Sequence, residues 1–101
     1  MEIKVSRKGQ RVHAMLVGEL DHHSAIQVRT VLDRLLDDPA VMELALDLSG
    51  VSFMDSSGLG VVLGRYRVLA SRGGKLLLNA VPLPIDKLFR MAGLYAIVER
   101  G

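Results

Sequence analysis

The sequence contains no cysteine and no tryptophan, and only 4% of its 101 residues are aromatic. Without cysteine the chain can form neither a disulfide framework nor a thiolate metal site, which fits a reducing compartment. No apolar run approaches the roughly 20 residues that a membrane-spanning helix needs. The N-terminal MEIKVSRKG also lacks the apolar stretch of a signal peptide. We therefore expect a cytoplasmic protein without membrane association.

The chain also carries no large net charge of either sign. Thirteen Lys and Arg residues against 11 Asp and Glu residues leave a formal net charge of +2. The basic residues are scattered and few aromatic residues accompany them, so the pattern is not typical of nucleic-acid binding. Half of the residues are hydrophobic, and a chain of this length can bury enough surface for one core. We expect a single domain over residues 1–101 with an aliphatic core.

The order of apolar patterns predicts a mixed α/β fold. Alternation over residues 3–16, with turn chemistry at Lys8-Gly9, predicts an N-terminal hairpin, and residues 18–23 are expected to form a polar loop. Ser24 and Gln27 have the spacing of a capping box that opens a helix through about residue 37. Helices and strands then alternate, which predicts a single α/β domain with helices packed on a mixed sheet. The later elements are expected at 41–48 (strand), up to about 72 (helix), 75–79 (strand), up to about 92 (helix) and 97–98 (strand).

The segment from Phe53 to Tyr66, FMDSSGLGVVLGRY, places two serines and an aspartate where a strand gives way to a helix. Asp and Ser at a helix start usually cap free backbone N–H groups, so Asp55 or Ser56 is expected to be the N-cap. Capping does not require Ser57 as well. Because the N–H groups and the dipole of a helix start attract a dianion, a serine that gains and loses a phosphate suits this position.

The helix that follows Asp55 has an unusual outer side. At 100° per residue, its core-facing arc is expected to hold Leu59, Val62, Leu63, Tyr66, Leu69 and Ala70. The opposite side, with Ser57, is expected to hold Gly60, Val61, Gly64 and Val68, flanked by Arg65 and Arg67. Each helical glycine (Gly58, Gly60, Gly64) costs about 1 kcal/mol relative to alanine. The glycines indicate either close packing within the chain or a flat strip for a partner backbone, and we favour the strip.

Other chemistries are weakly indicated. Asp21, His22 and His23 suggest a metal site, but adjacent histidines point to different sides and no second ligand cluster exists, so loop and capping roles are expected. The serine motif is not the G-x-S-x-G elbow of hydrolases, and no P-loop pattern is present. We expect no enzyme activity, no metal and no cofactor.

The segment FMDSSGLGVVLGRY closely resembles the phosphorylation-site segment of the anti-sigma factor antagonists of the STAS family. GELDHHSA at 18–25 and KLFRMAGL at 87–94 agree, so the resemblance spans nearly the whole chain. It implies that Ser57 is the phosphorylated residue, that Asp55 positions its hydroxyl and that Asp21 belongs to the partner-facing surface. The partner-binding residues are then expected to be Asp21, Asp55, Ser56, Gly58, Gly60, Val61, Gly64, Arg65, Arg67 and Val68.

The resemblance also implies a regulatory cycle. The unphosphorylated form would bind an anti-sigma factor and thereby free a sigma factor. That anti-sigma factor would also be an ATP-dependent serine kinase, which phosphorylates Ser57 and so releases the antagonist. A PP2C-type phosphatase would restore the hydroxyl. The alternative is a STAS interaction module of another assembly, such as a stress-signalling or lipid-transport complex.

Overall fold

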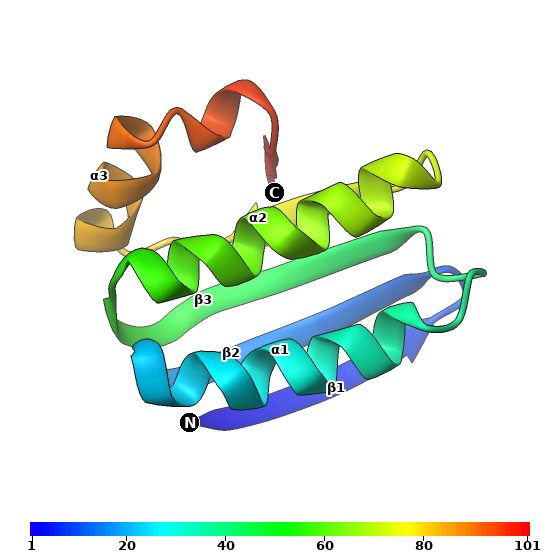
Figure 1. Ribbon diagram of the computed structural model, residues 1–101, viewed down its shortest axis with the longest axis horizontal. Helices are drawn as coiled ribbons and strands as arrows, with labels where there is room; N and C mark the ends of the chain where they lie inside the picture. The colour runs from blue at the N-terminus through cyan, green and yellow to red at the C-terminus, as the bar shows by residue number, and fades with distance from the viewer.

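Five strands lie in chain order across one mixed sheet in the computed structural model, which describes residues 1–101 (Figure 1). β1 (Glu2–Lys8) and β2 (Arg11–Leu20) form the predicted antiparallel hairpin. β3 (Glu43–Met54), β4 (Lys75–Asn79) and β5 (Glu99–Arg100) each run parallel to the strand before them. The predicted α/β class with a mixed sheet is confirmed.

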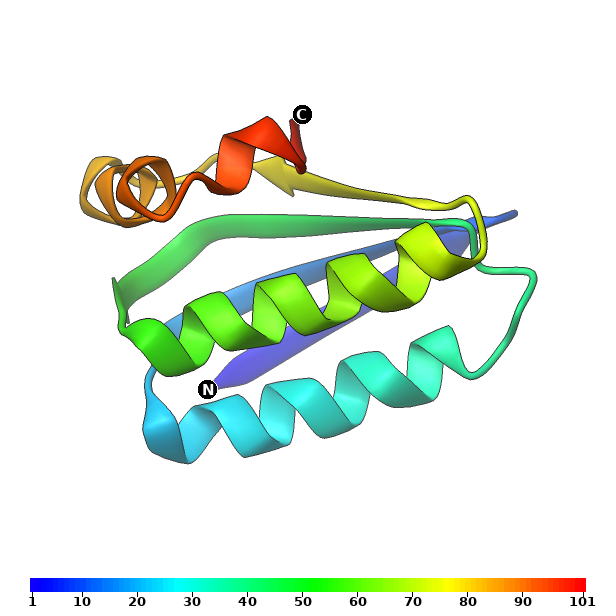
Figure 2. The same cartoon turned by 45° about the horizontal axis from the view of Figure 1, so that its top comes forward.

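Two long helices connect the parallel strands. α1 (His22–Leu36) joins β2 to β3, and α2 (Ser56–Ser71) joins β3 to β4. They lie side by side and run in the same direction across one face of the sheet (Figures 1 and 2), as right-handed crossovers between neighbouring parallel strands require. Both helices therefore begin at the same edge, where β2 and β3 end. α3 (Leu83–Met91) and a 3₁₀ turn (Leu94–Ala96) connect β4 to β5.

The first helix begins earlier than predicted. Residues 18–20 belong to β2 rather than to a loop, and Leu20 is fully buried. Asp21 is the N-cap of α1, because its Oδ1 accepts hydrogen bonds from the backbone N–H groups of His23 (2.9 Å) and Ser24 (3.0 Å). The capping box is real, but Ser24 is its third helical residue and not its first member, since Ser24 Oγ accepts from the N–H of Asp21.

The last strand is also displaced from its predicted position. Val98 is buried and Ile97 is half exposed, but the residues paired with β4 are Glu99 and Arg100. A cluster of polar groups holds this end: Tyr95 Oη donates to Asp86 at 2.6 Å and Arg90 Nε donates at 2.7 Å. These hydrogen bonds hold the pKa of Asp86 below its usual value, while burial and then the bond to Asp86 raise the pKa of Tyr95 to about 12.

Most of the core lies between the sheet and the two long helices, and α3 and the 3₁₀ turn add Ile85, Phe89 and Leu94. It is aliphatic, as expected, apart from Phe89 of α3. The strand expected at 41–48 is present but runs from 43 to 54, and its Leu44, Leu46 and Leu48 are all fully buried. Alternate residues of a strand share one face, so this strand supplies a continuous apolar row beneath the helices.

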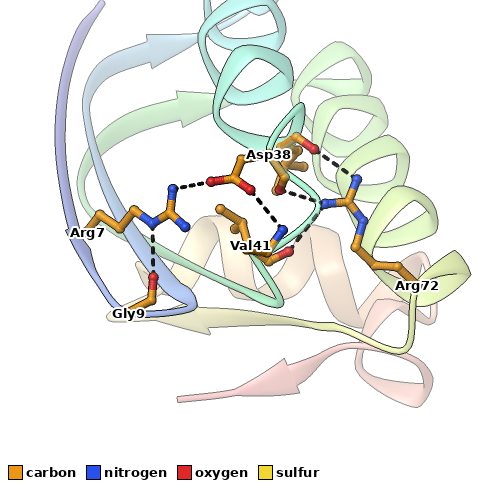
Figure 3. A network of polar contacts seen from close by, with 7 residues as sticks. Arg7, Gly9, Asp38, Val41 and Arg72 are labelled. Atoms are coloured by element: carbon orange, nitrogen blue, oxygen red, sulfur yellow. Dashed lines mark hydrogen bonds and ion pairs between the residues drawn. The ribbon is translucent and has the colours of Figure 1, made fainter.

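One arginine fastens the end of α2 to the loop that precedes β3 (Figure 3). Arg72 Nη2 donates to the carbonyl of Leu36 at 2.8 Å, and Arg72 Nη1 donates to the carbonyls of Asp38 and Val41 at 3.2 and 3.3 Å. The carboxylate of Asp38 accepts a 2.6 Å bond from Arg7 in β1. The far ends of α1, α2 and β1 are thereby joined through one loop.

Replacing this arginine should lower stability without touching the helix starts. Arg72→Met is expected to lower the free energy of unfolding by about 2 kcal/mol, because three carbonyls lose a charged donor. Urea denaturation measures the loss. Arg67→Met is the control, since Arg67 is exposed on the same helix and forms no ion pair or hydrogen bond within the chain. Equal stability of the two variants would contradict this role of Arg72.

Candidate functional site

The two long helices begin with almost the same backbone geometry. The N-cap Asp21 has φ −111° and ψ −172°, and the N-cap Asp55 has φ −111° and ψ −168°. Asp55 Oδ1 accepts from the N–H of Ser57 at 2.8 Å, so the prediction that Asp55 or Ser56 caps α2 is confirmed for Asp55. The N–H of Asp55 bonds to the carbonyl of Leu20, which ties the two helix starts together.

Ser57 is the second residue of α2 and is half-buried, whereas its neighbour Ser56 is exposed. Asp55 holds Ser57 by its backbone N–H, and the Ser57 hydroxyl forms no hydrogen bond within the chain. The carboxylate therefore fixes the position of Ser57 through the main chain. The hydroxyl itself stays available for reaction at the positive end of the helix dipole.

Gly58 is explained by packing within the chain. A Cβ atom at this position would lie 2.4 Å from Met54 Cγ, 2.9 Å from Leu20 Cγ and 3.1 Å from the Leu20 carbonyl oxygen. Only glycine lets α2 begin so close to the ends of β2 and β3. A Cβ at Gly60 or Gly64 would meet nothing within 4 Å, so internal packing does not account for these two glycines.

The expected exposure of the other side of α2 is wrong at Val61 and Arg65 and only partly right at Val68. Val61 is only 4% exposed and Arg65 only 8% exposed, because α1 packs along that side of α2 (Figure 2). Val68, expected on the same strip, is half-buried and packs against the core, while Ala70, expected in the core, is exposed. The helical period of α2 predicts which residues face the sheet, but it does not predict which residues are covered by a neighbouring helix.

Ser57 opens on a groove between α1 and α2 with a volume of about 370 Å³. The groove is lined by His22, Ala25, Ile26 and Arg29 of α1 and by Ser57, Gly60, Val61 and Arg65 of α2. Sequence reasoning missed the contribution of α1. The spacing of His22, Ile26 and Arg29, at i, i+4 and i+7 of one helix, places them on a common face and could have indicated it.

Of the remaining predicted site residues, Asp21 lies at the start of α1, whereas Arg67 lies in the second half of α2. Asp21 is half-buried, and hydrogen bonds from the N–H groups of Ser24 and His23 hold its pKa below the usual value, against the opposing effect of burial. Arg67 is exposed. The structure gathers no group of three His, Asp or Glu side chains placed to hold a metal ion. None of its helices combines the length and the apolar character needed to cross a membrane.

Residues 3–100 match the STAS domain family, so the chain belongs to this family. It is 41% identical over 83 residues to an anti-sigma F factor antagonist of Paenibacillus polymyxa, covering 82% of this chain and 71% of the relative. It is 44% identical over 80 residues to that of Lysinibacillus sphaericus, with coverage of 78% and 68%. An anti-sigma-B factor antagonist of Listeria monocytogenes is 33% identical over 99 residues, with coverage of 98% and 85%.

Solved structures agree with this assignment. The anti-sigma factor antagonist SpoIIAA in its unphosphorylated form superposes with a TM-score of 0.81 at 30% identity, covering 99% of this chain and 87% of that chain. SpoIIAA of Bacillus in the phosphorylated form superposes with a TM-score of 0.81 at 32% identity, with coverage of 99% and 91%. The resemblance seen in the sequence and the predicted STAS fold are confirmed.

Proposed function

We propose that this protein is an anti-sigma factor antagonist that is switched off by phosphorylation of Ser57. The observation that carries the proposal is the position of Ser57, which presents an unbonded hydroxyl at the start of α2. The similarity to SpoIIAA, whose structures include both unphosphorylated and phosphorylated forms, supports it.

The proposed cycle has two partners. The unphosphorylated chain binds an anti-sigma factor and frees its sigma factor, and the anti-sigma factor acts as the serine kinase that modifies Ser57. A PP2C-type phosphatase restores the hydroxyl. The similarity to anti-sigma F factor antagonists favours a role in sporulation. The chain is a ligand and a substrate in the cytoplasm, catalyses nothing and needs no cofactor.

The proposed partner surface extends from the starts of α1 and α2 along α2 as far as Arg67. Its accessible members are Asp21, Asp55, Ser56, Ser57, Gly60, Gly64 and Arg67. Gly58, Val61 and Arg65 are buried and support this surface from within, and Val68 lies at its margin. A phosphate on Ser57 adds about −1.5 to −2 charge. Burying such a hydrated dianion beside Asp55 in an interface is costly unless it is paired, so phosphorylation opposes docking.

The choice of serine is tested directly. After incubation with the anti-sigma F factor of the same organism and ATP, the wild-type chain should carry one phosphate, and Ser57→Ala none, by intact mass spectrometry. Ser56→Ala is the matched control and should be modified like the wild type, because its neighbour Ser57 is unchanged. Stoichiometric phosphate on Ser56 would refute the assignment.

A second candidate is a STAS module of another assembly. The match to the anti-sigma-B factor antagonist of Listeria covers 98% of this chain. This similarity favours a stress-signalling assembly over a lipid-transport assembly. Parallel binding assays with the anti-sigma F and anti-sigma-B factors distinguish the two regulators. A lipid-transport subunit would not need the serine, so its assembly would be unaffected by Ser57→Ala.

A further inference from the structure

The guanidinium group of Arg65 has unused hydrogen-bonding capacity. The Arg65 side chain is nine-tenths buried on the wall of the groove between α1 and α2. Its Nε lies 3.1 Å from Asp33 Oδ1, but the two groups are not aligned for a hydrogen bond, and Nη1 has no partner. Buried polar groups are ordinarily satisfied, and a guanidinium offers five N–H donors. This arginine therefore has N–H donors free to bind an anion.

A second arginine lines the same groove from the opposite helix. Arg29 of α1 is exposed and forms no ion pair within the chain. Burial lowers the pKa of Arg65; the charge of Asp33 opposes this effect and the charge of Arg29 adds to it. Two cations thus line the groove, and the carboxylate that contacts one of them, Asp33, is half-exposed. The groove has a local excess of positive charge although the whole chain is nearly neutral.

Ser57 lies at the end of this groove. Ser57 and Arg65 are separated by roughly 12 Å along the axis of α2. The guanidinium of Arg65 lies beside Asp33, with Nε 3.1 Å from Asp33 Oδ1, and it lines the same groove as Ser57. Gly60 lies between them and contributes no side chain, and Arg29 has the freedom of an exposed side chain. A group attached to the Ser57 hydroxyl would enter a space bordered by both arginines.

We propose that the α1–α2 groove is an internal receptor for the phosphoryl group of phosphorylated Ser57, held by Arg29 from one helix and Arg65 from the other. The proposal rests on the proposed phosphorylation of Ser57 and adds what becomes of the phosphate. The dianion folds back between the helices, and the two guanidinium groups neutralise it. Modification then turns the Ser57 side chain away from the partner surface and also occupies the groove beside it.

The test uses full-length protein in which phosphoserine is installed at position 57 during translation, so that no kinase is needed. ³¹P NMR then gives the pKa of the phosphoserine. In the otherwise wild-type chain this pKa should lie at least about 0.5 unit below that in Arg29→Gln, because a neighbouring cation favours the dianion. The control Arg67→Gln removes an exposed arginine outside the groove and should match the wild type.

Other charged groups near the phosphate are controlled separately. His22 lines the groove from α1, so the comparison is repeated in a His22→Gln background. Asp21 of the α1 cap, Asp33 of α1 and Asp55 of the α2 cap are present in every variant, so their effects cancel. Arg65→Met should raise the phosphoserine pKa as well. Its melting temperature shows whether it is folded, and Arg29→Gln decides the question if it is not.

Equal phosphoserine pKa values in the wild type and in folded Arg29→Gln would overturn the proposal. If that result came with lost anti-sigma factor binding by unphosphorylated Arg29→Gln, the groove would instead receive an acidic side chain of the partner. The two proposals can fail separately. A kinase that leaves Ser57 unmodified, together with a shifted pKa of the installed phosphoserine, would refute the proposed function but support the receptor.

Discussion

Phosphoserine at position 57 is expected to weaken binding to the anti-sigma factor at least 100-fold, about 2.8 kcal/mol. The modified residue is half-buried at the start of α2, next to the carboxylate of Asp55. Docking would have to strip water from this dianion, and a phosphate that lies in the groove takes the Ser57 side chain away from the partner. Isothermal titration calorimetry with the anti-sigma factor, comparing both forms of the chain, measures this loss.

Substitutions separate the charge from the shape of the modified residue. Ser57→Ala should bind like the unmodified chain and should not be released by ATP, because it has no hydroxyl to modify. Ser57→Asp should lose less affinity than phosphoserine, since aspartate carries one charge and phosphate nearly two. The exposed Ser56→Asp is the matched control and should have a smaller effect. Equal affinities of the phosphorylated and unmodified chains would refute the electrostatic switch.

Features decided by a few neighbouring residues could be predicted from the sequence. The strand that carries Leu44, Leu46 and Leu48 follows from a period of two, and the cap of α2 follows from the preference of aspartate for that position. The start of α1 was misplaced for an equally local reason. Asp21 and Ser24 both bond to the free backbone groups, and the sequence does not decide which of them caps the helix.

Features that depend on contacts between distant segments could not be predicted. Arginine is usually a surface residue, yet Arg65 is covered by α1, which ends at Leu36, far earlier in the chain. The same contact buries Val61 and creates the groove beside Ser57. The expected exposure of this side of α2 was therefore half correct: Gly60 is exposed and Gly64 is half-buried, whereas the valine and the arginine beside them form the inner wall of a groove.

Two glycines in the same turn of α2 should respond in opposite ways to alanine. Gly58→Ala places a methyl group 2.4 Å from Met54 Cγ and 3.1 Å from the carbonyl oxygen of Leu20. The methionine side chain can move, but the carbonyl belongs to the backbone at the end of β2 and accepts the N–H of Asp55. Overpacking of this kind costs about 1–3 kcal/mol, which exceeds the gain in helix propensity of about 1 kcal/mol.

We therefore expect Gly58→Ala to lower the free energy of unfolding by up to about 2 kcal/mol. Gly60→Ala should raise it by up to about 1 kcal/mol, because the methyl group at Gly60 meets no atom within 4 Å and only the propensity changes. Urea denaturation of both variants measures the difference. Since relief of the clash at Gly58 moves the start of α2, phosphorylation of the adjacent Ser57 should slow in Gly58→Ala even where the protein remains folded. A similar stability change in both variants would show that the close approach of α2 to the ends of β2 and β3 does not depend on Gly58.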